Sequence, residues 1–315
     1  MQLLATLGRV VVRLVVVLLI VTFVTFGMLK LLPGDPIATL RPVSTEEQRD
    51  EIREELGLND PFLVQYGNWL RDFFTGDFGR YYDSGESVNA KLEKSLPVSL
   101  QLMGYSIALA LLIAIPLGVI TAYRSGTRFD RGANAAAFGL LALPNFVLGL
   151  LLATYLGARW QILPTQGYEE FGADPVEHFR FMVLPVVALA VAQIAVYMRL
   201  LRSDMIATLQ ENFVTTAKAK GVSPRRVLFR HALRPSSLTL LTVAGLNMGT
   251  LIGGAIVIEV IFALPGMGRN IYEAILTSQY VALQSFVAII AVAYVLINAL
   301  IDILYAVLDP RIRRA

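Results

Sequence analysis

The chain contains no cysteine and only two histidines among its 315 residues. Without cysteine it can form no disulfide, no thiolate metal site and no cysteine nucleophile. The two histidines, His178 and His231, are far apart, with no histidine or acidic neighbour at the spacing that metal ligands require. We therefore expect both to be ordinary loop residues and the chain to hold no metal ion.

Charge is scarce as well. Charged residues make up 16% of the chain and hydrophobic residues 56%, whereas soluble domains carry about 25% charged residues. Six apolar segments are long enough, at about 1.5 Å per residue, to cross a hydrocarbon layer of about 30 Å. They cover residues 9–32, 98–123, 135–158, 181–198, 238–262 and 281–308. The fold class predicted is an all-α integral membrane protein with six transmembrane helices.

The usual sources of energy for transport are absent from the sequence. No Gly-x-x-x-x-Gly-Lys-Ser/Thr phosphate loop occurs, so the chain is not expected to hydrolyse ATP by that route. The middles of the six segments lack the ionisable groups that ion-coupled carriers need. Glu259 and Asp302 lie near segment ends and are expected to be structural. With no acid, base and nucleophile cluster on either face, the chain is not expected to be an enzyme.

The first segment is expected to remain as a membrane anchor. Arg9 and Arg13 precede an uncharged run, and Lys30 follows it without the small-x-small pattern of a signal-peptidase site. If the N-terminus is cytoplasmic, the short inner loops and the tail hold the basic clusters 124–131, 199–234 and 311–314, as the positive-inside rule requires. Both termini are therefore predicted to lie inside a plasma or inner membrane.

The predicted outer insertion, residues 33–95, separates the first segment, 1–32, from a five-helix core, 96–308, and a tail, 309–315. Ser44 to Glu47 has the capping-box pattern, Gly57 is a plausible helix end, and Pro61 opens a second helix. One face of that helix holds Phe62, Tyr66, Trp69, Leu70 and Phe73. Either the helix lies in the membrane interface, or the insertion is a small packed subdomain that buries this face.

The fifth segment carries a stripe of small residues at spacings of four. Such residues let helices approach closely, so helix packing is one explanation, and a flexible pore wall is the other. The candidate residues for this face are Gly245, Asn247, Gly249 and Gly253. Proline also interrupts earlier segments at Pro116, Pro144 and Pro185.

The longest inner loop, residues 199–236, predicts a helix, a corner and a second helix. Gly221 suits a C-terminal cap at positive φ, and Ser223 with Pro224 is typical of a helix start. The short first helix would then project beneath the membrane, with alanines and threonines that permit close docking. The alternative is a basic amphipathic surface lying on anionic lipid.

This loop resembles the cytoplasmic coupling signature of binding-protein-dependent ABC importer permeases, which reads Glu-Ala-Ala, three residues, Gly, nine residues, Ile-x-Leu-Pro. Gly221 matches the glycine and Ala217 the second alanine, while Thr215 and Thr216 stand in place of Glu and Ala. The end departs from the general pattern: His231 replaces Ile, Arg234 takes the proline position, and Pro235 comes one residue later. The form found here is similar to that of the dipeptide and oligopeptide branch.

The resemblance covers nearly the whole chain, because further motifs of that branch follow in order. They are residues 31–36, 56–58, 76–79, 163–164, 259–268 and 308–311. The resemblance implies the type I ABC importer permease architecture. It implies import of dipeptides or oligopeptides; nickel or glutathione permeases of the same family, and an ion-coupled carrier, are the alternatives.

The same resemblance implies a set of partners. These are a second, paralogous permease, two ATP-binding cassette subunits or a fused one, and an extracytoplasmic substrate-binding protein, with no nucleic acid. ATP and Mg would be bound by the ATPase subunits, so that this chain holds no cofactor. The residues expected to couple to the ATPase are Thr215, Thr216, Ala217, Lys218, Lys220 and Gly221.

Overall fold

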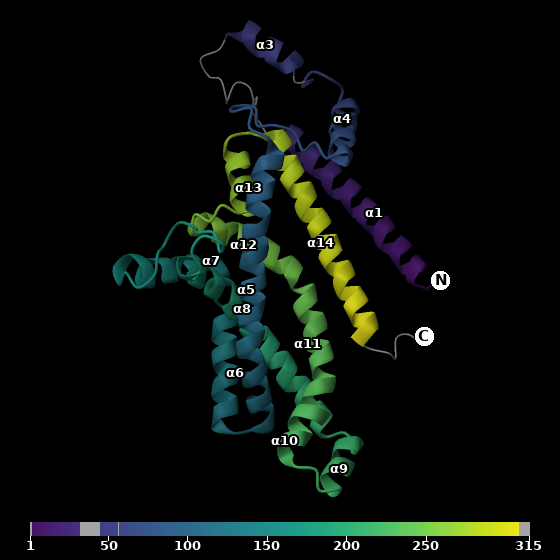
Figure 1. Cartoon of the computed structure of the whole chain (residues 1–315), viewed down its shortest axis with the longest axis vertical. Helices are drawn as coiled ribbons and strands as arrows, with labels where there is room; N and C mark the ends of the chain where they lie inside the picture. The colour runs from purple at the N-terminus through teal and green to yellow at the C-terminus, as the bar shows by residue number, and fades with distance from the viewer. Residues whose placement is uncertain (1, 32–44, 56, 309–315) are drawn as a thin grey trace. The chain divides into compact units, whose positions relative to one another are not determined.

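A computed structural model describes residues 2–31, 45–55 and 57–308. These residues are mostly helical (Figure 1), and the pairing of Arg80 with Ser87 is an isolated bridge. The chain divides into two compact units. Unit 1 comprises residues 1–99 and 265–296, and unit 2 comprises residues 100–264 and 297–315. The predicted division at residues 33, 96 and 309 stays a prediction.

Four helices are long and apolar enough to span a membrane without interruption. They are α1 (Gln2–Leu31), α5 (Val88–Tyr123), α8 (Pro175–Leu209) and α14 (Tyr280–Leu308). Two further spans are possible if each of two bent helix pairs crosses as one unit. Counted in that way, the described residues provide the six spans predicted, in an all-helical membrane protein.

The first bent pair joins α6 (Arg128–Leu141) to α7 (Asn145–Leu152) and its continuation η1 (Ala153–Arg159), at an angle of 93°. Pro144 explains the break, because proline has no N–H to donate and disfavours helical backbone in the residue before it. Pro144 adopts φ −59° and ψ 141° and starts α7 afresh. By contrast, Pro185 is accommodated inside α8.

The second bent pair forms the predicted fifth span. It consists of α10 (Pro224–Arg226), the π-helix η2 (Val227–Leu233), α11 (Arg234–Leu246) and α12 (Met248–Ile261). The axis turns by 57° between Leu246 and Leu251, around Asn247. The predicted fifth span is therefore bent at Asn247.

Unit 1 contains the outer helices α3 (Glu46–Glu55) and α4 (Phe62–Thr75), together with α13 (Met267–Leu276). Ser44, the expected cap of α3, lies outside the described residues; Thr45 and Gln48 exchange reciprocal side-chain to backbone hydrogen bonds instead, at 3.1 and 3.4 Å. Gly57 follows α3 at φ 65°, as predicted for a helix end.

The aromatic face of α4 is packed inside unit 1. Tyr66 and Trp69 are each 9% exposed, and Tyr66 meets the ring of Phe23 on α1 edge-on at a centroid distance of 5.4 Å. Tyr66 also shares a 2.9 Å hydrogen bond with Thr22. The aromatic face is therefore packed against α1 and α14 within unit 1, and the two interpretations of the insertion stay predictions.

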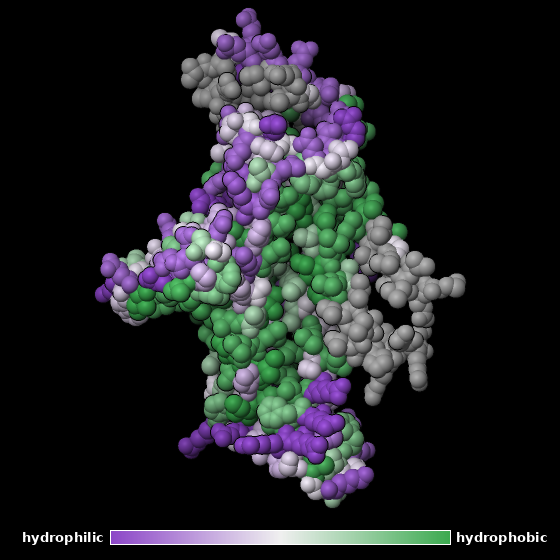
Figure 2. All heavy atoms as spheres, viewed as in Figure 1, coloured by the Kyte–Doolittle hydropathy of each residue, from purple (hydrophilic) through white to green (hydrophobic). Residues whose placement is uncertain are grey.

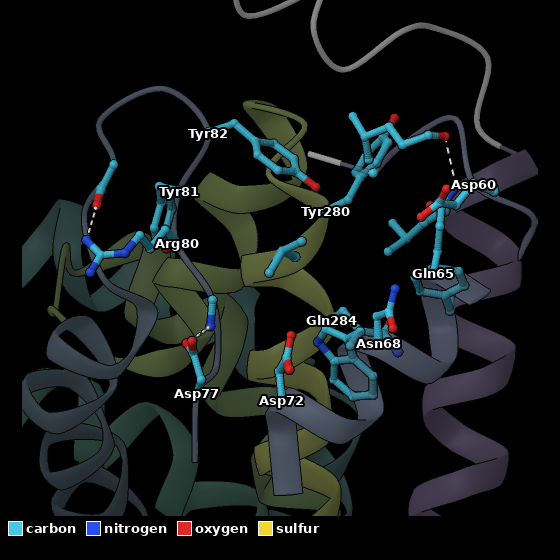
Figure 3. A pocket seen from close by; sticks show the side chains of 18 residues that line it. Asp60, Gln65, Asn68, Asp72, Asp77, Arg80, Tyr81, Tyr82, Tyr280 and Gln284 are labelled. Atoms are coloured by element: carbon cyan, nitrogen blue, oxygen red, sulfur yellow. Dashed lines mark hydrogen bonds between the residues drawn. The ribbon is translucent and has the colours of Figure 1, made fainter. Parts of the chain in front are cut away.

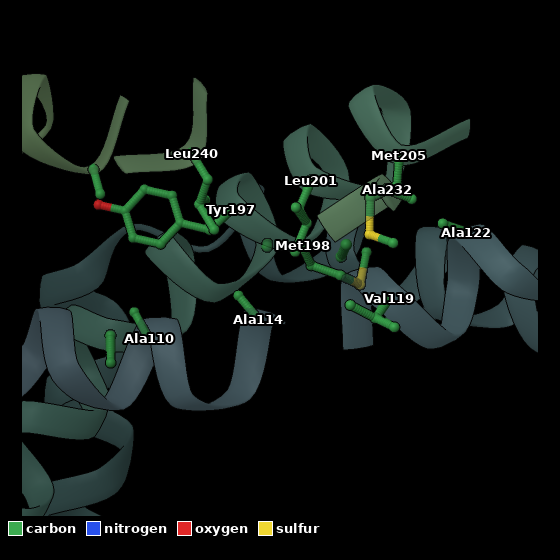
Figure 4. Packing of buried hydrophobic residues seen from close by; sticks show 14 residues of the cluster. Ala110, Ala114, Val119, Ala122, Tyr197, Met198, Leu201, Met205, Ala232 and Leu240 are labelled. Carbon is green, nitrogen blue, oxygen red and sulfur yellow. The ribbon is translucent and has the colours of Figure 1, made fainter. Parts of the chain in front are cut away.

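Unit 2 is built around α8. Tyr197, Leu201 and Met205 on α8 are completely buried against small residues of α5 such as Ala110 and Ala114 (Figure 4). Small residues such as these let neighbouring helices approach closely.

Large hydrophobic side chains also cover the outside of these helices. In unit 2, Leu112 is 72% exposed and Leu150 59% exposed. Figure 2 shows hydrophilic side chains gathered over α3 in unit 1 and over the α9–α10 end of unit 2, with hydrophobic residues along the long helices. Exposed apolar helix surfaces of this extent are those of a multi-pass membrane protein.

Candidate coupling site

The candidate site begins where α8 ends. After Gln210 and Glu211 the chain turns into the short helix α9 (Asn212–Ala219), which contacts both α8 and η2. α9 ends in a two-bond cap: the Gly221 N–H donates to the Lys218 carbonyl at 3.0 Å, and the Val222 N–H donates to the Ala217 carbonyl at 3.1 Å. This is the Schellman arrangement, which needs a left-handed residue, and Gly221 has φ 77°. The predicted glycine corner is confirmed.

The two faces of α9 differ in burial. Val214 and Ala217 are buried against the rest of unit 2, whereas Thr215, Thr216 and Lys218 are exposed. The exposed threonine hydroxyls donate back to carbonyls of their own helix, Thr216 to Asn212 at 2.9 Å. Among the candidate coupling residues, Ala217 therefore packs against the rest of unit 2, and the others are exposed on the outer side of the loop.

The sequence reasoning overlooked one exposed residue on α9. Phe213 is 48% exposed, at the start of the helix and beside the threonines. Aromatic side chains such as this one are enriched among the anchors of protein interfaces. Its position within a polar loop was the signal that could have found it.

The second half of the loop also follows the prediction in outline. Ser223 occupies the N-cap position and Pro224 the first helical position of α10, although the Ser223 side chain makes no cap hydrogen bond. The chain then runs through η2 directly into α11. Thr208 on α8 and Ser236 on α11 lie within hydrogen-bonding distance, 3.2 Å apart, which links the two long helices above α9.

Both histidines lie in helices, so the expectation of loop positions was wrong. His231 belongs to η2, and His178 lies in the first turns of α8. His178 is completely buried; its Nδ1 lies 2.7 Å from the Glu169 carbonyl oxygen, and the rings of Tyr105 and Tyr168 meet it edge-on. It fastens the segment before α8 to this helix, a contact that no local pattern reveals.

The structure shows a close helix contact for one residue of the small-residue stripe. A Cβ at Gly245 would lie 2.6 Å from Ile301 Cδ1, whereas one at Gly253 would meet nothing within 4 Å. Asn247 donates from Nδ2 to Gln193 Oε1 at 3.2 Å, so it joins α8 to the bend. Gly245 thus serves helix packing; for Gly249 and Gly253 the role stays a prediction.

Unit 1 contains a separate cavity of about 500 Å³ beside α4 (Figure 3). Its polar lining is largely engaged in holding loops: the Asp77 carboxylate accepts from the Gly79 N–H at 2.9 Å, and Arg80 donates to the Gly85 carbonyl at 3.1 Å. Burial raises the pKa of Tyr82, which also lines the cavity. No motif in the sequence predicted this cavity.

Two protein-family models match this chain, and one of them includes the loop of residues 199–236. The family model described as "Binding-protein-dependent transport system inner membrane component" matches residues 114–314, and so includes α9 and Gly221. A second model, "Binding-prot-dependent transport system membrane comp, N-term", matches residues 3–103. The chain belongs to this family of transport permeases.

Individual relatives of the permease match along almost its full length. It is 37% identical to a probable peptide ABC transporter permease protein of Sinorhizobium fredii over 301 residues, which cover 95% of this chain and 96% of the relative. It is 37% identical to the oligopeptide transport system permease protein AppB of Bacillus subtilis, covering 94% and 95% of the two chains. The dipeptide transport system permease protein DppB of Bacillus subtilis is 34% identical, covering 94% of each.

Proposed function

We propose that this permease forms part of the translocation pathway of an ATP-driven importer of dipeptides or oligopeptides. Substrate would be delivered by an extracytoplasmic binding protein, and a second permease would complete the pathway. Two ATP-binding cassette subunits, or a fused one, would bind ATP and Mg, so that this chain needs no cofactor. The named functions of the relatives support the substrate class.

The observation that carries the proposal is the geometry of α9. A short helix with one buried and one exposed face, closed by Gly221, projects from the ends of α8 and η2. Because its buried face fixes it to the permease, a force applied to the exposed face reaches the long helices without bending α9. Thr215, Thr216, Lys218 and Lys220 present that face, with Phe213 beside them.

The mechanism follows from this attachment. Closure of the ATPase subunits on nucleotide would displace α9. Because α9 contacts α8 and η2, it would move the end of α8 and the η2 end of the bent fifth span with it. Opening the pathway to the opposite side then needs no chemistry in this chain. This scheme places α9 and both termini on the cytoplasmic side, in agreement with the basic residues of the inner loops.

The test is reconstitution. We would purify the permease with the partners that remain bound to it, identify them, and measure uptake of labelled di- and tetrapeptides into proteoliposomes that contain ATP. We expect uptake to require both the binding protein and hydrolysable ATP. Uptake that is abolished by an ionophore and insensitive to loss of the ATPase would overturn the proposal in favour of an ion-coupled carrier. Nickel or glutathione uptake without peptide uptake would overturn the substrate class alone.

A further inference from the structure

We propose that Asp130 and Arg202 form a positioning pair that locks α6 to α8, so that displacement of α9 is transmitted to the third span. The inference rests on the proposed function, because it concerns how force from the coupling helix spreads within the permease. Neither residue touches the proposed docking face. Their 72-residue separation in sequence hides the pair from any local pattern.

The Asp130 carboxylate is held by donors on every side. Arg202 donates from Nε to Oδ1 at 2.6 Å and from Nη2 to Oδ2 at 2.7 Å. The Gly126 N–H donates to Oδ2 at 2.9 Å, and Asn134 Nδ2 donates to Oδ1 at 2.8 Å. The Asp130 side chain is only 3% exposed and that of Arg202 is 24% exposed, so the pair is largely shielded from water.

A second arginine on α8 contacts the same helix. Arg199 places its Cζ 3.7 Å from the centroid of the Phe138 ring on α6. Arg199 and Arg202 are one turn apart on α8, and their partners follow in reverse order on α6, as expected for antiparallel neighbours. The two contacts together fix both the register and the rotation of α6 against α8.

The rest of this interface is apolar and contains several alanines. Ala137 on α6 and Ala195 on α8 are buried in the same cluster, which Ala133 and Ile194 extend. Small apolar side chains allow close approach but provide few ridges that would oppose a shift along the axis. A two-pronged arginine–carboxylate pair is directional, because both hydrogen bonds break if one helix moves by a few ångström.

Buried ion pairs are seldom kept for stability alone, because their desolvation offsets much of the attraction. At this position the pair has a mechanical use. Arg202 lies seven residues before the end of α8 at Leu209, about 10 Å along the axis, and α9 begins at Asn212. Motion of α9 therefore reaches the pair almost directly, and through it α6 and the bend at Pro144.

The experiment uses the purified complex with Asp130→Asn and Arg202→Lys, which keep side-chain size or charge but lose the two-pronged pair. The matched control is Glu177→Gln, which removes the exposed Glu177–Arg180 pair of 2.9 Å at the opposite end of α8. We expect peptide imported per ATP hydrolysed to fall about tenfold in both pair variants, as loss of one charged hydrogen bond in the transmitting state implies, and to be unchanged in the control.

A distance measurement separates transmission from stability. Because the chain has no cysteine, spin labels can be introduced at Arg131, exposed on α6, and Gln210, exposed just beyond α8. We expect the distance between them to be the same with and without nucleotide in the wild-type complex, and to change with nucleotide in Asp130→Asn.

Two results would overturn the inference: a nucleotide-dependent change of this distance in the wild-type complex, or an unchanged import ratio in both pair variants. If the wild-type complex imports no peptide, the proposed substrate fails instead. In that event the distance between the spin labels at positions 131 and 210, measured with nucleotide and without peptide, still decides whether α6 and α8 move together.

Discussion

The indole N–H of Trp69 donates to the hydroxyl of Ser285 at 3.1 Å, and that hydroxyl donates in turn to the Phe78 carbonyl at 2.8 Å. These two consecutive hydrogen bonds connect α4 to α14 and to the loop after α4, all within unit 1. This connection helps to hold the Trp69 side of α4 against α14. A buried indole N–H needs an acceptor, and α14 supplies one.

Replacing Trp69 with phenylalanine keeps much of the apolar area but removes the donor. We expect a loss of about 1 kcal/mol, the usual net value of such a bond, seen as a lower melting temperature of the detergent-purified protein. Phe74→Leu is the control, because Phe74 lies on the same helix and is 60% exposed. Equal melting temperatures for Trp69→Phe and wild type would show that this link contributes nothing to unit 1.

The corner at Gly221 makes a sharper prediction. Valine tolerates positive φ poorly and asparagine tolerates it well, so Gly221→Val should abolish ATP-driven uptake while Gly221→Asn retains most of it. Nothing lies within 4 Å of a Cβ at Gly221, so the uptake difference is expected to come from backbone strain and not from a clash of the Cβ. Membrane insertion of both variants is checked by their yield in the membrane fraction.

Gly76→Val provides the matched control, since Gly76 caps α4 at φ 86° with nothing within 4 Å of its Cβ. It carries the same strain away from the coupling loop. Uptake per inserted molecule should therefore survive in Gly76→Val. Full uptake by Gly221→Val would contradict the role given to this corner.

The features that the sequence predicted are those encoded locally. Gly221 with Ser223 and Pro224 marks two helix ends within four residues, and a composition with few charges identifies the membrane spans. The bend at Pro144 was visible as a helix-disturbing residue, but its angle of 93° depends on how α7 packs on α8 and α12. Proline permits a break, and tertiary packing decides its size.

The features that the sequence could not predict depend on distant partners. Asp130 looks like any first-turn acid until α8 brings Arg202 beside it. His178 likewise appears to be a loop residue until the Glu169 carbonyl and a set of aromatic rings enclose it. Contacts across 72 residues leave no periodic trace in one sequence, so only the folded chain reveals them.

Phe213 allows a direct test of the docking face. We expect Phe213→Ala to weaken retention of the ATPase during purification about tenfold or more, because exposed aromatic anchors often contribute 2 kcal/mol or above in interfaces. The fold should be unaffected, since the side chain is 48% exposed in the isolated chain. Retention is measured by co-purification at graded salt and detergent. Leu63→Ala is the control, because the Leu63 side chain is 70% exposed on α4 in unit 1; equal retention by both variants would remove Phe213 from the interface.

The small-residue stripe can be resolved by a pair of alanine substitutions. In Gly245→Ala the new Cβ would lie within 2.7 Å of three Ile301 atoms, so the helices must separate or Ile301 must change rotamer. Such overpacking costs about 1–3 kcal/mol. In Gly253→Ala nothing is displaced, and the better helix propensity of alanine should stabilise the span by up to about 1 kcal/mol. Melting temperatures in detergent should therefore move in opposite directions, and a shift of the same sign and size in both variants would show that the stripe acts as one uniform surface.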